Sequence, residues 1–354
     1  MIQPRAHVAT LAPVPHGSIT DAELARLGLG RDQVVDFSTN TNPLGPSPAA
    51  VAAARAAVWT HYPDDGATRL RQAIAEREGS APEGVVVGNG SAELIWLVAL
   101  AFLDPGQSAV VVGPTFGEYA RAVRVAGGVV REARARGEDG FRPDLAALGV
   151  GAGSARLLFV CDPNNPTGLL LGAEALARLA GARPETLVVV DEAYRPFVDD
   201  PPAWPAIPGN VVLLRSMTKD GALPGLRLGY ALAAPPVARA LEAVRPPWSV
   251  NAVAQAAGLA ALADRAHVAR ARDEVRRARA YVTAELTRLG LRVFPSAANF
   301  LLVEVGDGAA MRAALLRHGL VVRDCASFGL PAHVRIGLRA LPECQRLIEA
   351  FGRL

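Results

Sequence analysis

The feature that most limits the fold is a series of short apolar runs, rich in valine and leucine, separated by longer amphipathic segments. The runs continue without the polar–apolar alternation of a strand that has one face in water. Continuous apolar strands separated by helices are typical of βα units, in which helices cover both faces of a mostly parallel sheet. The sequence therefore predicts an α/β fold with strands in residues 84–88, 108–113, 155–161, 186–194 and 210–219.

The pattern changes near residue 250. A long arginine-rich helical stretch comes first, followed by shorter strand and helix segments up to the end of the chain. This second part is typical of a smaller α+β domain, to which the first residues contribute an arm. We expect a large domain over residues 45–250 and a smaller part built from residues 1–44 and 251–354.

Composition excludes several classes of function. The net charge is only +3, and basic residues are interleaved with acidic ones along the chain. Nucleic acid is therefore not an expected partner. Three widely spaced cysteines, Cys161, Cys325 and Cys344, predict neither a disulfide framework nor a metal site. The longest apolar run, "LIWLVALAFL", is too short to span a bilayer, and no signal peptide is indicated, so a cytoplasmic location is expected.

Polar residues gather in the loops after the predicted strands, where an open α/β sheet builds its site. "GNGSAE" (88–93) follows the first strand, and Gly90, Ser91 and Ala92 would offer backbone N–H groups to an anion at a helix N-terminus. A plain tight turn is an equally good explanation of this glycine-rich segment. "GPTFGEY" (113–119) supplies aromatic rings that either stack on a planar ligand or pack against the sheet.

The next two loops carry an amide and a carboxylate. Asn165 lies in "CDPNNPTG" (161–168). This segment is either simply a turn or a rigid loop that presents Asn165 to the site as a hydrogen-bond donor. Asp191 ends the strand in "VVVDEAY" (188–194), and burying its carboxylate without a partner would be very costly. A protonated ring nitrogen would be such a partner, and a helix N-cap is the competing explanation.

Lys219 is the only lysine among the 37 basic residues. An amine condenses with an aldehyde, whereas a guanidinium effectively cannot, so a single lysine indicates chemistry that only an amine performs. Ser216, Thr218 and Arg227 surround it in the sequence and suit an anionic ligand. A solvated surface lysine is the alternative. Taken together, these groups match the phosphate, ring, phenolic oxygen, ring nitrogen and aldehyde of pyridoxal 5′-phosphate (PLP).

The motifs "CDPNNPTG", "DEAY" and "SMTK…GLRLGY" resemble those of the class I/II (fold-type I) PLP-dependent aminotransferase family over nearly the whole chain. The resemblance implies the fold-type I architecture, with a seven-stranded-type sheet between helices. Two subgroups are similar, the L-threonine O-3-phosphate decarboxylases and the histidinol-phosphate aminotransferases. Segments such as "DFSTNTNPLG" (36–45) and "VRDCASF" (322–328) are more similar to the decarboxylases. Asp220 and Gly221, directly after the lysine, match neither subgroup.

The resemblance also implies a role for each residue. Lys219 resembles the Schiff-base lysine, and Asp191 resembles the partner of the ring nitrogen. The other cofactor-binding positions are Asn165 and Tyr194 at the phenolic oxygen, Tyr119 stacked on the ring, and Gly90, Ser91, Ala92, Ser216, Thr218 and Arg227 around the phosphate, with Tyr62 reaching the phosphate from the partner subunit of a homodimer. The substrate-binding positions are Arg335 at the carboxylate, Arg323 and His16 at a substrate phosphate, and Asn42 in the same pocket.

From these motifs we expect PLP-dependent decarboxylation of L-threonine O-3-phosphate to (R)-1-amino-2-propanol phosphate, a step of cobalamin biosynthesis, through an external aldimine formed with substrate at Lys219. The alternative is an aminotransferase that acts on histidinol phosphate, or on a related amino substrate, with 2-oxoglutarate. A third possibility is a non-catalytic α/β module that binds a nucleotide through "GNGS". Of these possibilities, only the two PLP-dependent enzymes would be coloured and would react with borohydride.

Overall fold

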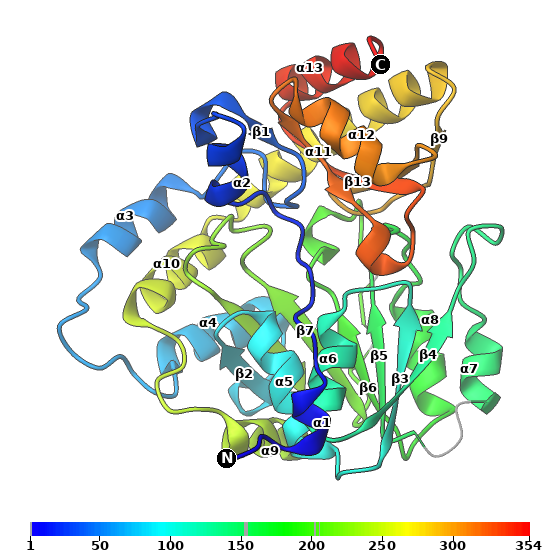
Figure 1. Cartoon of the computed structure of the whole chain (residues 1–354). Helices are drawn as coiled ribbons and strands as arrows, with labels where there is room; N and C mark the ends of the chain where they lie inside the picture. Colours follow the sequence, from blue (N-terminus) through cyan, green and yellow to red (C-terminus); the bar gives the residue numbers. More distant parts are fainter. Residues whose placement is uncertain (1, 152–154, 202, 205) are drawn as a thin grey trace.

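A seven-stranded sheet forms the centre of the larger part of the molecule (Figure 1). The computed structural model describes residues 2–151, 155–201, 203–204 and 206–354. The strand order is β2-β8-β7-β6-β5-β3-β4, and β8 alone runs antiparallel to its neighbours. This confirms the α/β fold with a mostly parallel sheet. The strands are β2 (Val85–Gly88), β3 (Ser108–Gly113), β4 (Val129–Arg134), β5 (Leu157–Cys161), β6 (Leu187–Asp191), β7 (Val211–Ser216) and β8 (Gly229–Ala233).

Both faces of the sheet are buried, because alternate residues of each strand enter two separate cores. On β6, for example, Val188 and Val190 pack into one core, whereas Leu187 and Val189 pack into the other. Each fully buried valine or leucine contributes about 1.5–3 kcal/mol through removal of apolar surface from water. One core includes α3 (Pro48–Ala56), α4 (Thr68–Glu78), α7 (Leu145–Gly151), α8 (Ala173–Gly181) and α10 (Ala252–Ala263), and the other includes α5 (Ser91–Phe102), α6 (Glu118–Val125) and α9 (Pro235–Val244).

A second, antiparallel sheet of order β12-β13-β10-β9 lies above the first in Figure 1. Helices pack on this sheet around a third core, which contains Leu301, Val334 and Ile336. Its elements are α11 (Arg265–Arg288), β9 (Arg292–Val293), β10 (Phe300–Glu304), α12 (Gly308–Leu316), β12 (Arg323–Asp324), β13 (His333–Gly337) and α13 (Leu341–Phe351), with a 3-10 turn at η4 (Ala326–Phe328). Other 3-10 turns are η1 (Arg31–Gln33) in the N-terminal segment, η2 (Pro82–Gly84) directly before β2, and η3 (Arg195–Phe197) after β6.

The N-terminal segment joins the smaller sheet region and then descends along the larger one (Figure 1). β1 (Val35–Asp36) pairs in parallel with β11 (Leu320–Val321), and Phe37 enters the third core. Helix α2 (Asp21–Arg26) packs by Leu24 against α12, whereas the short α1 (Ala6–Ala9) lies against α6. The arm therefore bridges the two parts of the molecule.

The change from one core to the next occurs later than the sequence suggested. Helix α10 contributes Ala254, Ala257 and Leu262 to the core of the larger sheet. Helix α11 begins after Asp264, whose Oδ1 accepts a hydrogen bond of 3.0 Å from the backbone N–H of His267. Helix α10 thus packs with the larger part of the molecule although it follows residue 250, because its small residues allow close packing on α3. The domain boundary at residue 250 stays a prediction.

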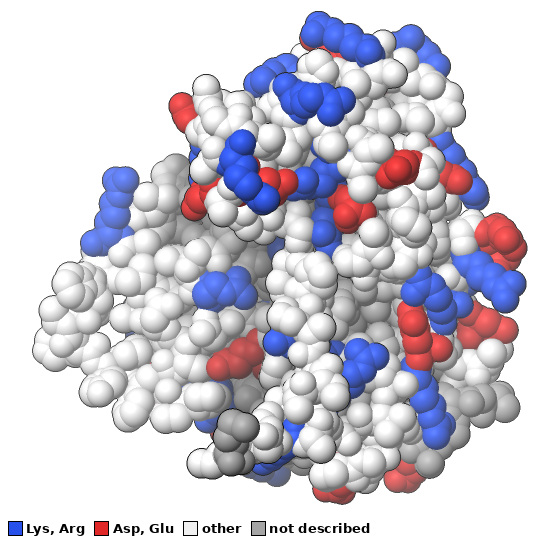
Figure 2. All heavy atoms as spheres, viewed as in Figure 1, with Lys and Arg blue, Asp and Glu red and all other residues white. Residues whose placement is uncertain are grey.

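The surface carries interleaved charges over the face shown in Figure 2. Within the described residues, no helix combines the length and apolar character needed to cross a membrane. Cys161, Cys325 and Cys344 are all buried and free of disulfides. The same residues contain no cluster of three or more histidine, cysteine or acidic side chains that would hold a metal ion.

Candidate active site

Two adjoining cavities lie where the strands of the larger sheet end and the smaller sheet begins. The inner cavity has a volume of about 130 Å³ and the outer one about 370 Å³. The polar loops predicted from the sequence therefore do converge, as expected for the carboxyl ends of parallel strands. The residues that line both cavities are Phe116, Asn165, Tyr194, Lys219 and Arg227.

One end of the inner cavity is rich in hydrogen-bond donors. Helix α5 begins at Ser91 after Gly90, which has a φ of +80°. A Cβ atom at Gly90 would lie 2.5 Å from Nη2 of Arg227, so only glycine allows the guanidinium to approach this turn. The Ser216 and Thr218 hydroxyls lie 2.8 Å apart on the same side. A helix N-terminus, two hydroxyls and an arginine make this end suited to a phosphate.

The other end of the inner cavity presents a carboxylate. Asp191 ends β6 and is buried, and its Oδ1 accepts a hydrogen bond of 3.0 Å from the backbone N–H of Ala193. Its Oδ2 accepts a hydrogen bond of 2.7 Å from the hydroxyl of Tyr119. Burial raises the pKa of Asp191, although both hydrogen bonds and the charge of Lys219 act against that shift.

Tyr119 lines the inner cavity, where we expected a ring that stacks on the cofactor, but its ring is packed into the core. Its ring is 1% exposed and stacks on Phe159, with 5.4 Å between centroids and 12° between planes. Phe116 instead lines both cavities and is only partly buried. Sequence spacing did not separate the two rings, because helix α6 begins between them and turns Tyr119 back toward the core.

Asn165 and Tyr194 meet at the border between the cavities. Asn165 Oδ1 accepts a hydrogen bond from Nη1 of Arg335, which leaves the Nδ2 amide of Asn165 as a donor for a ligand. The Tyr194 ring packs edge-on against Phe300, with 4.8 Å between centroids. Burial raises the pKa of Tyr194 to about 12, so its hydroxyl remains protonated at neutral pH.

The outer cavity has basic side chains and an aromatic wall. Arg335 donates from Nη2 to the backbone carbonyl of Ser38 at 2.7 Å, and its buried Nε has no hydrogen-bond partner within the described residues. Arg323 donates from Nη2 to the carbonyl of Pro15 at 2.9 Å and to the Ser327 hydroxyl at 2.6 Å. Among the described residues, no aspartate or glutamate belongs to the lining, so the cavity favours an anionic ligand.

His16 reaches the outer cavity from the N-terminal arm, as the resemblance implied. Its Nε2 lies 3.5 Å from Oε1 of Glu118, a buried carboxylate at the start of α6. Oε2 of Glu118 accepts a hydrogen bond of 3.2 Å from Nε1 of Trp96. Sequence reasoning missed Glu118, because no motif links the first turn of this helix to an arm 100 residues earlier.

Asn42 does not line either cavity, contrary to our expectation. Its side chain is 2% exposed and donates from Nδ2 to the backbone carbonyl of Asp220 at 2.8 Å. Its backbone N–H donates to the carbonyl of Lys219, also at 2.8 Å. Asn40 lies in the cavity lining instead, two residues earlier. Asn42 therefore binds the backbone of Lys219 and Asp220 from outside the two cavities.

We expect Asn42→Ala to lower the free energy of unfolding by about 1–2 kcal/mol and to lower kcat severalfold, because one buried hydrogen bond to the lysine loop is lost. Thermal unfolding and steady-state kinetics measure the two effects. Asn210→Ala is the matched control, since Asn210 Nδ2 donates to carbonyls of Ala180, Arg183 and Thr186 away from the cavities. Equal loss of kcat in both variants would contradict a role for Asn42 at the lysine.

The two residues that depart from the family pattern have a structural place. Asp220 is buried, and its Oδ1 has no hydrogen-bond partner in the described part of the chain. A Cβ atom at Gly221 would lie 2.7 Å from the backbone oxygen of Met217, so glycine lets this turn close tightly. Neither residue lines the inner or the outer cavity, so both act on Lys219 only through the conformation of the loop.

Tyr62 lies away from both cavities of its own chain. Its side chain is 80% exposed, and its ring lies 4.6 Å from that of Trp248. Exposed apolar side chains of Leu44, Val58 and Trp59 accompany it. Such a surface is typical of a protein–protein interface.

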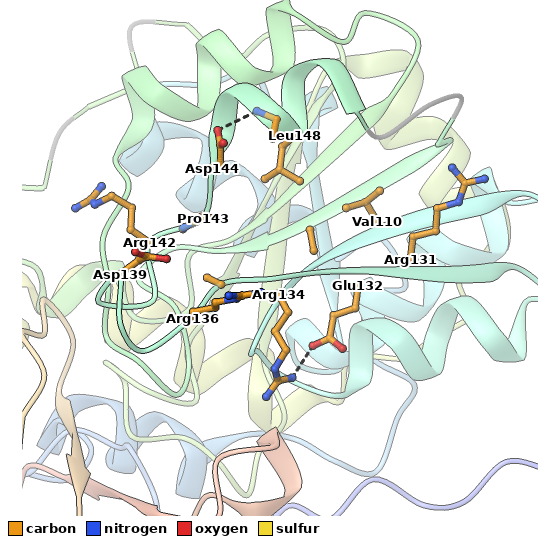
Figure 3. Close-up of a pocket in the computed structure, with 13 residues that line it drawn as sticks. Val110, Arg131, Glu132, Arg134, Arg136, Asp139, Arg142, Pro143, Asp144 and Leu148 are labelled. Atoms are coloured by element: carbon orange, nitrogen blue, oxygen red, sulfur yellow. Dashed lines mark hydrogen bonds and ion pairs between the residues drawn. The ribbon is translucent and has the colours of Figure 1, made fainter.

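A third cavity, of about 500 Å³, lies at the β4 edge of the larger sheet (Figure 3). Exposed arginines and acidic residues of β4 and the following turn line it, and none of the predicted site residues does. Arg134, paired there with Glu132, also donates to the carbonyls of Phe328 and Gly329. This edge therefore supports η4, which borders the outer cavity.

Comparison with known proteins now places this arrangement in a family. The family model described as aminotransferase class I and II matches residues 32–351. The chain belongs to this aminotransferase family. It is similar to a histidinol-phosphate aminotransferase of Symbiobacterium thermophilum (44% identical, 91% of each chain covered) and to one of an Anaeromyxobacter species (41% identical, 98% of each chain covered).

Solved structures agree with the family assignment. The aminotransferase is similar, at a TM-score of 0.89 and 25% identity, to histidinol-phosphate aminotransferase from Sinorhizobium meliloti in complex with pyridoxal-5′-phosphate, covering 100% of this chain and 97% of that one. A Thermus thermophilus aspartate aminotransferase mutant gives a TM-score of 0.86 at 29% identity, with 100% of both chains covered. These comparisons confirm PLP as the cofactor of the family and do not support the expected decarboxylase.

The residues of this aminotransferase fit PLP. The donor-rich turn at Gly90 suits the phosphate, and the buried carboxylate of Asp191, which has no cationic partner within 4.0 Å among the described residues, suits a protonated ring nitrogen. The amine of Lys219 lies between these two ends, in the lining of the inner cavity. Each group that the cofactor requires is therefore present in one cavity.

Burial lowers the pKa of Lys219 from 10.5 to about 8, with Arg335 and Arg227 adding to the shift and Asp191 opposing it. Because a lowered pKa increases the fraction of neutral amine, PLP capture by the apoprotein should rise with pH with a midpoint near 8 and level off above that pH. Borohydride trapping followed by mass spectrometry of the peptide that contains Lys219 measures this rate. A midpoint near 10.5 would contradict the influence of the site on the amine.

Proposed function

We propose that this protein transfers the amino group of histidinol phosphate, or of a closely related phosphorylated amine, to 2-oxoglutarate. The observation that carries the proposal is the outer cavity, which combines Arg323, Arg335 and His16 with an aromatic wall and, in the part of the chain that the structure describes, has no acidic side chain in its lining. A phosphate and a dicarboxylic oxo acid are both anionic, so one basic cavity suits both substrates in turn. The names of the two bacterial relatives point the same way.

Each residue has a defined task in this reaction. When bound, PLP supplies an electron sink for the charge that develops at the substrate Cα. Lys219 would hold the cofactor, and its amine, when neutral, would serve as the base for the Cα proton of the substrate. Asp191 would keep the ring nitrogen protonated, and Asn165 and Tyr194 would donate to the phenolic oxygen.

Arg335 and Arg323 decide how the substrate is held. Arg335 is anchored by Asn165 and Ser38, so its guanidinium is fixed with a free Nε donor. Arg323 lies on β12 beside Arg335 on β13, since the two residues are register partners in the antiparallel pair. Two adjacent guanidinium groups are a strong site for a phosphate.

We propose that the protein acts as a homodimer in which Tyr62 reaches the cofactor phosphate of the partner subunit. The support is the exposed apolar surface of Leu44, Val58, Trp59, Tyr62 and Trp248, which includes the aromatic pair Tyr62–Trp248. In Figure 2 the protruding side of the molecule that carries α3 shows few charged atoms.

Incubation of the purified holoenzyme with histidinol phosphate and 2-oxoglutarate tests the function. We expect glutamate to form in equal amount to the ketone phosphate, with no release of CO₂. A parallel incubation with L-threonine O-3-phosphate, in the absence of an oxo acid, should release no CO₂. CO₂ from the second mixture and no glutamate from the first would overturn the proposal in favour of decarboxylation.

A further inference from the structure

The hydroxyl of Tyr119 makes an unusual contact for a core aromatic. Its ring is packed between Phe159, stacked at 5.4 Å, and Phe116, edge-on at 5.7 Å, within the core on the α5 and α6 side of the sheet. From there the hydroxyl reaches the end of β6 and donates to Oδ2 of Asp191 at 2.7 Å. Packing accounts for the ring, but it does not account for the direction of the hydroxyl.

The contact matters because Asp191 has few other partners. Among the described residues no arginine, lysine or histidine forms an ion pair with its carboxylate, which is 4% exposed. The Ala193 backbone N–H on Oδ1 and the Tyr119 hydroxyl on Oδ2 are its two donors. A buried carboxylate without donors takes up a proton, whereas hydrogen bonds to the charged form keep it ionised.

Tyr119 acts as a donor rather than as a second acid. Burial and the nearby Asp191 charge raise the pKa of Tyr119 well above its ordinary value, so the phenol keeps its proton. Each oxygen of Asp191 therefore accepts one bond, and lone pairs remain for a further donor from the inner cavity, which Asp191 lines. The two bonds also fix the plane of the carboxylate.

We propose that Tyr119 is a positioning residue for the cofactor, whose hydroxyl keeps the Asp191 carboxylate ionised and correctly oriented to pair with the protonated ring nitrogen of PLP. This proposal concerns cofactor binding and does not depend on which amine the enzyme uses. It also gives Tyr119 a task other than stacking on the ring, a position that Phe116 is better placed to fill.

Tyr119→Phe tests the proposal, because phenylalanine keeps the ring on Phe159 and removes only the hydroxyl. The measurement is the dissociation constant of the apoprotein for PLP and for its 1-deaza analogue, in which a carbon atom replaces the ring nitrogen. We expect the variant to bind PLP about tenfold more weakly, as for loss of a hydrogen bond to a charged group. Affinity for the deaza analogue should change less than about twofold, because it presents no N–H to Asp191.

The matched control is Tyr230→Phe. The Tyr230 hydroxyl also donates to a carboxylate, Oε1 of Glu78 at 2.6 Å, from a buried ring that lines neither the inner nor the outer cavity. This variant should lose thermal stability to a similar extent and keep both dissociation constants. The control thus separates a general loss of stability from an effect transmitted through Asp191.

A double variant provides a second, independent test. In an Asp191→Asn background the carboxylate is absent, so adding Tyr119→Phe should change PLP affinity less than about twofold. Equal weakening of PLP and deaza-PLP in Tyr119→Phe would make Tyr119 a packing residue and overturn the proposal. Unchanged PLP affinity, or a full tenfold loss that persists in the Asp191→Asn background, would also overturn it.

Discussion

Lys219→Ala is expected to remove the visible absorbance of the lysine-bound cofactor and to lower kcat at least about 10³-fold. Under the proposed function two roles are lost together, because the same amine would hold PLP covalently and move the Cα proton. No other side chain can replace it, since Lys219 is the only lysine of the chain. Absorbance spectra and glutamate formation measure the two losses.

Lys219→Arg separates charge from reactivity. Arginine keeps a positive charge in the inner cavity, but its guanidinium stays protonated and does not condense with an aldehyde. We expect this variant to be as inactive as Lys219→Ala while it binds PLP non-covalently. Borohydride should fix no cofactor to residue 219 in either variant. Retention of the absorbance band or of activity would show that another group carries the cofactor.

The apolar runs predicted the centre of the fold because burial dominates there. Strands β2, β3, β5, β6 and β7 are almost entirely buried, and their sequences are accordingly mostly apolar, with polar residues only at or near their ends. Strand β4 was missed because it is an edge strand with mostly exposed side chains, "VVREAR". Strand β8 was missed for another reason, since "GYALA" lies inside a motif that we interpreted only as part of the cofactor site.

Several of the site residues that sequence reasoning found lie at or just after the end of a strand of the larger sheet, or at the start of the helix that follows. Chain topology alone brings Ser91, Asp191 and Lys219 together at one edge of the sheet. The direction of a side chain from a loop is harder to predict, because it depends on contacts with distant segments. Asn40 and Asn42 illustrate this, since one lies in the cavity lining and the other binds the backbone of Asp220.

The reaction itself was the hardest part to predict. Decarboxylation and transamination use the same lysine, aspartate and phosphate site, and they differ in which Cα bond is held perpendicular to the ring. That choice depends on how the outer cavity orients the substrate, and the motifs we weighed most heavily, such as "VRDCASF", do not fix it. Similarity over the whole chain favoured transamination where the short motifs had favoured decarboxylation.

Arg335→Leu should lower kcat/KM for both substrates at least about 30-fold, as for removal of one member of a buried, hydrogen-bonded charge pair. Arg335 is 6% exposed and holds Asn165 as well as the carbonyl of Ser38. Its loss removes a cation for the substrate anion. It also removes the hydrogen bond that holds the amide oxygen of Asn165 in place. Steady-state kinetics with the amine and the oxo acid varied in turn measure the effect on each half of the reaction.

Two further variants decide how Arg335 acts. Arg335→Lys keeps the charge but loses the planar fork, so an activity between those of the wild type and Arg335→Leu indicates that geometry as well as charge is used.

Arg339→Leu is the control, because Arg339 lies outside both cavities and pairs at 3.5 Å with Glu343 near the surface, where an ion pair contributes little. If Arg339→Leu and Arg335→Leu reduced kcat/KM equally, the outer cavity would not be the substrate site. If Arg335→Leu affected one substrate alone, the two substrates would bind through different arginines, and Arg323 would then be the cation for the other.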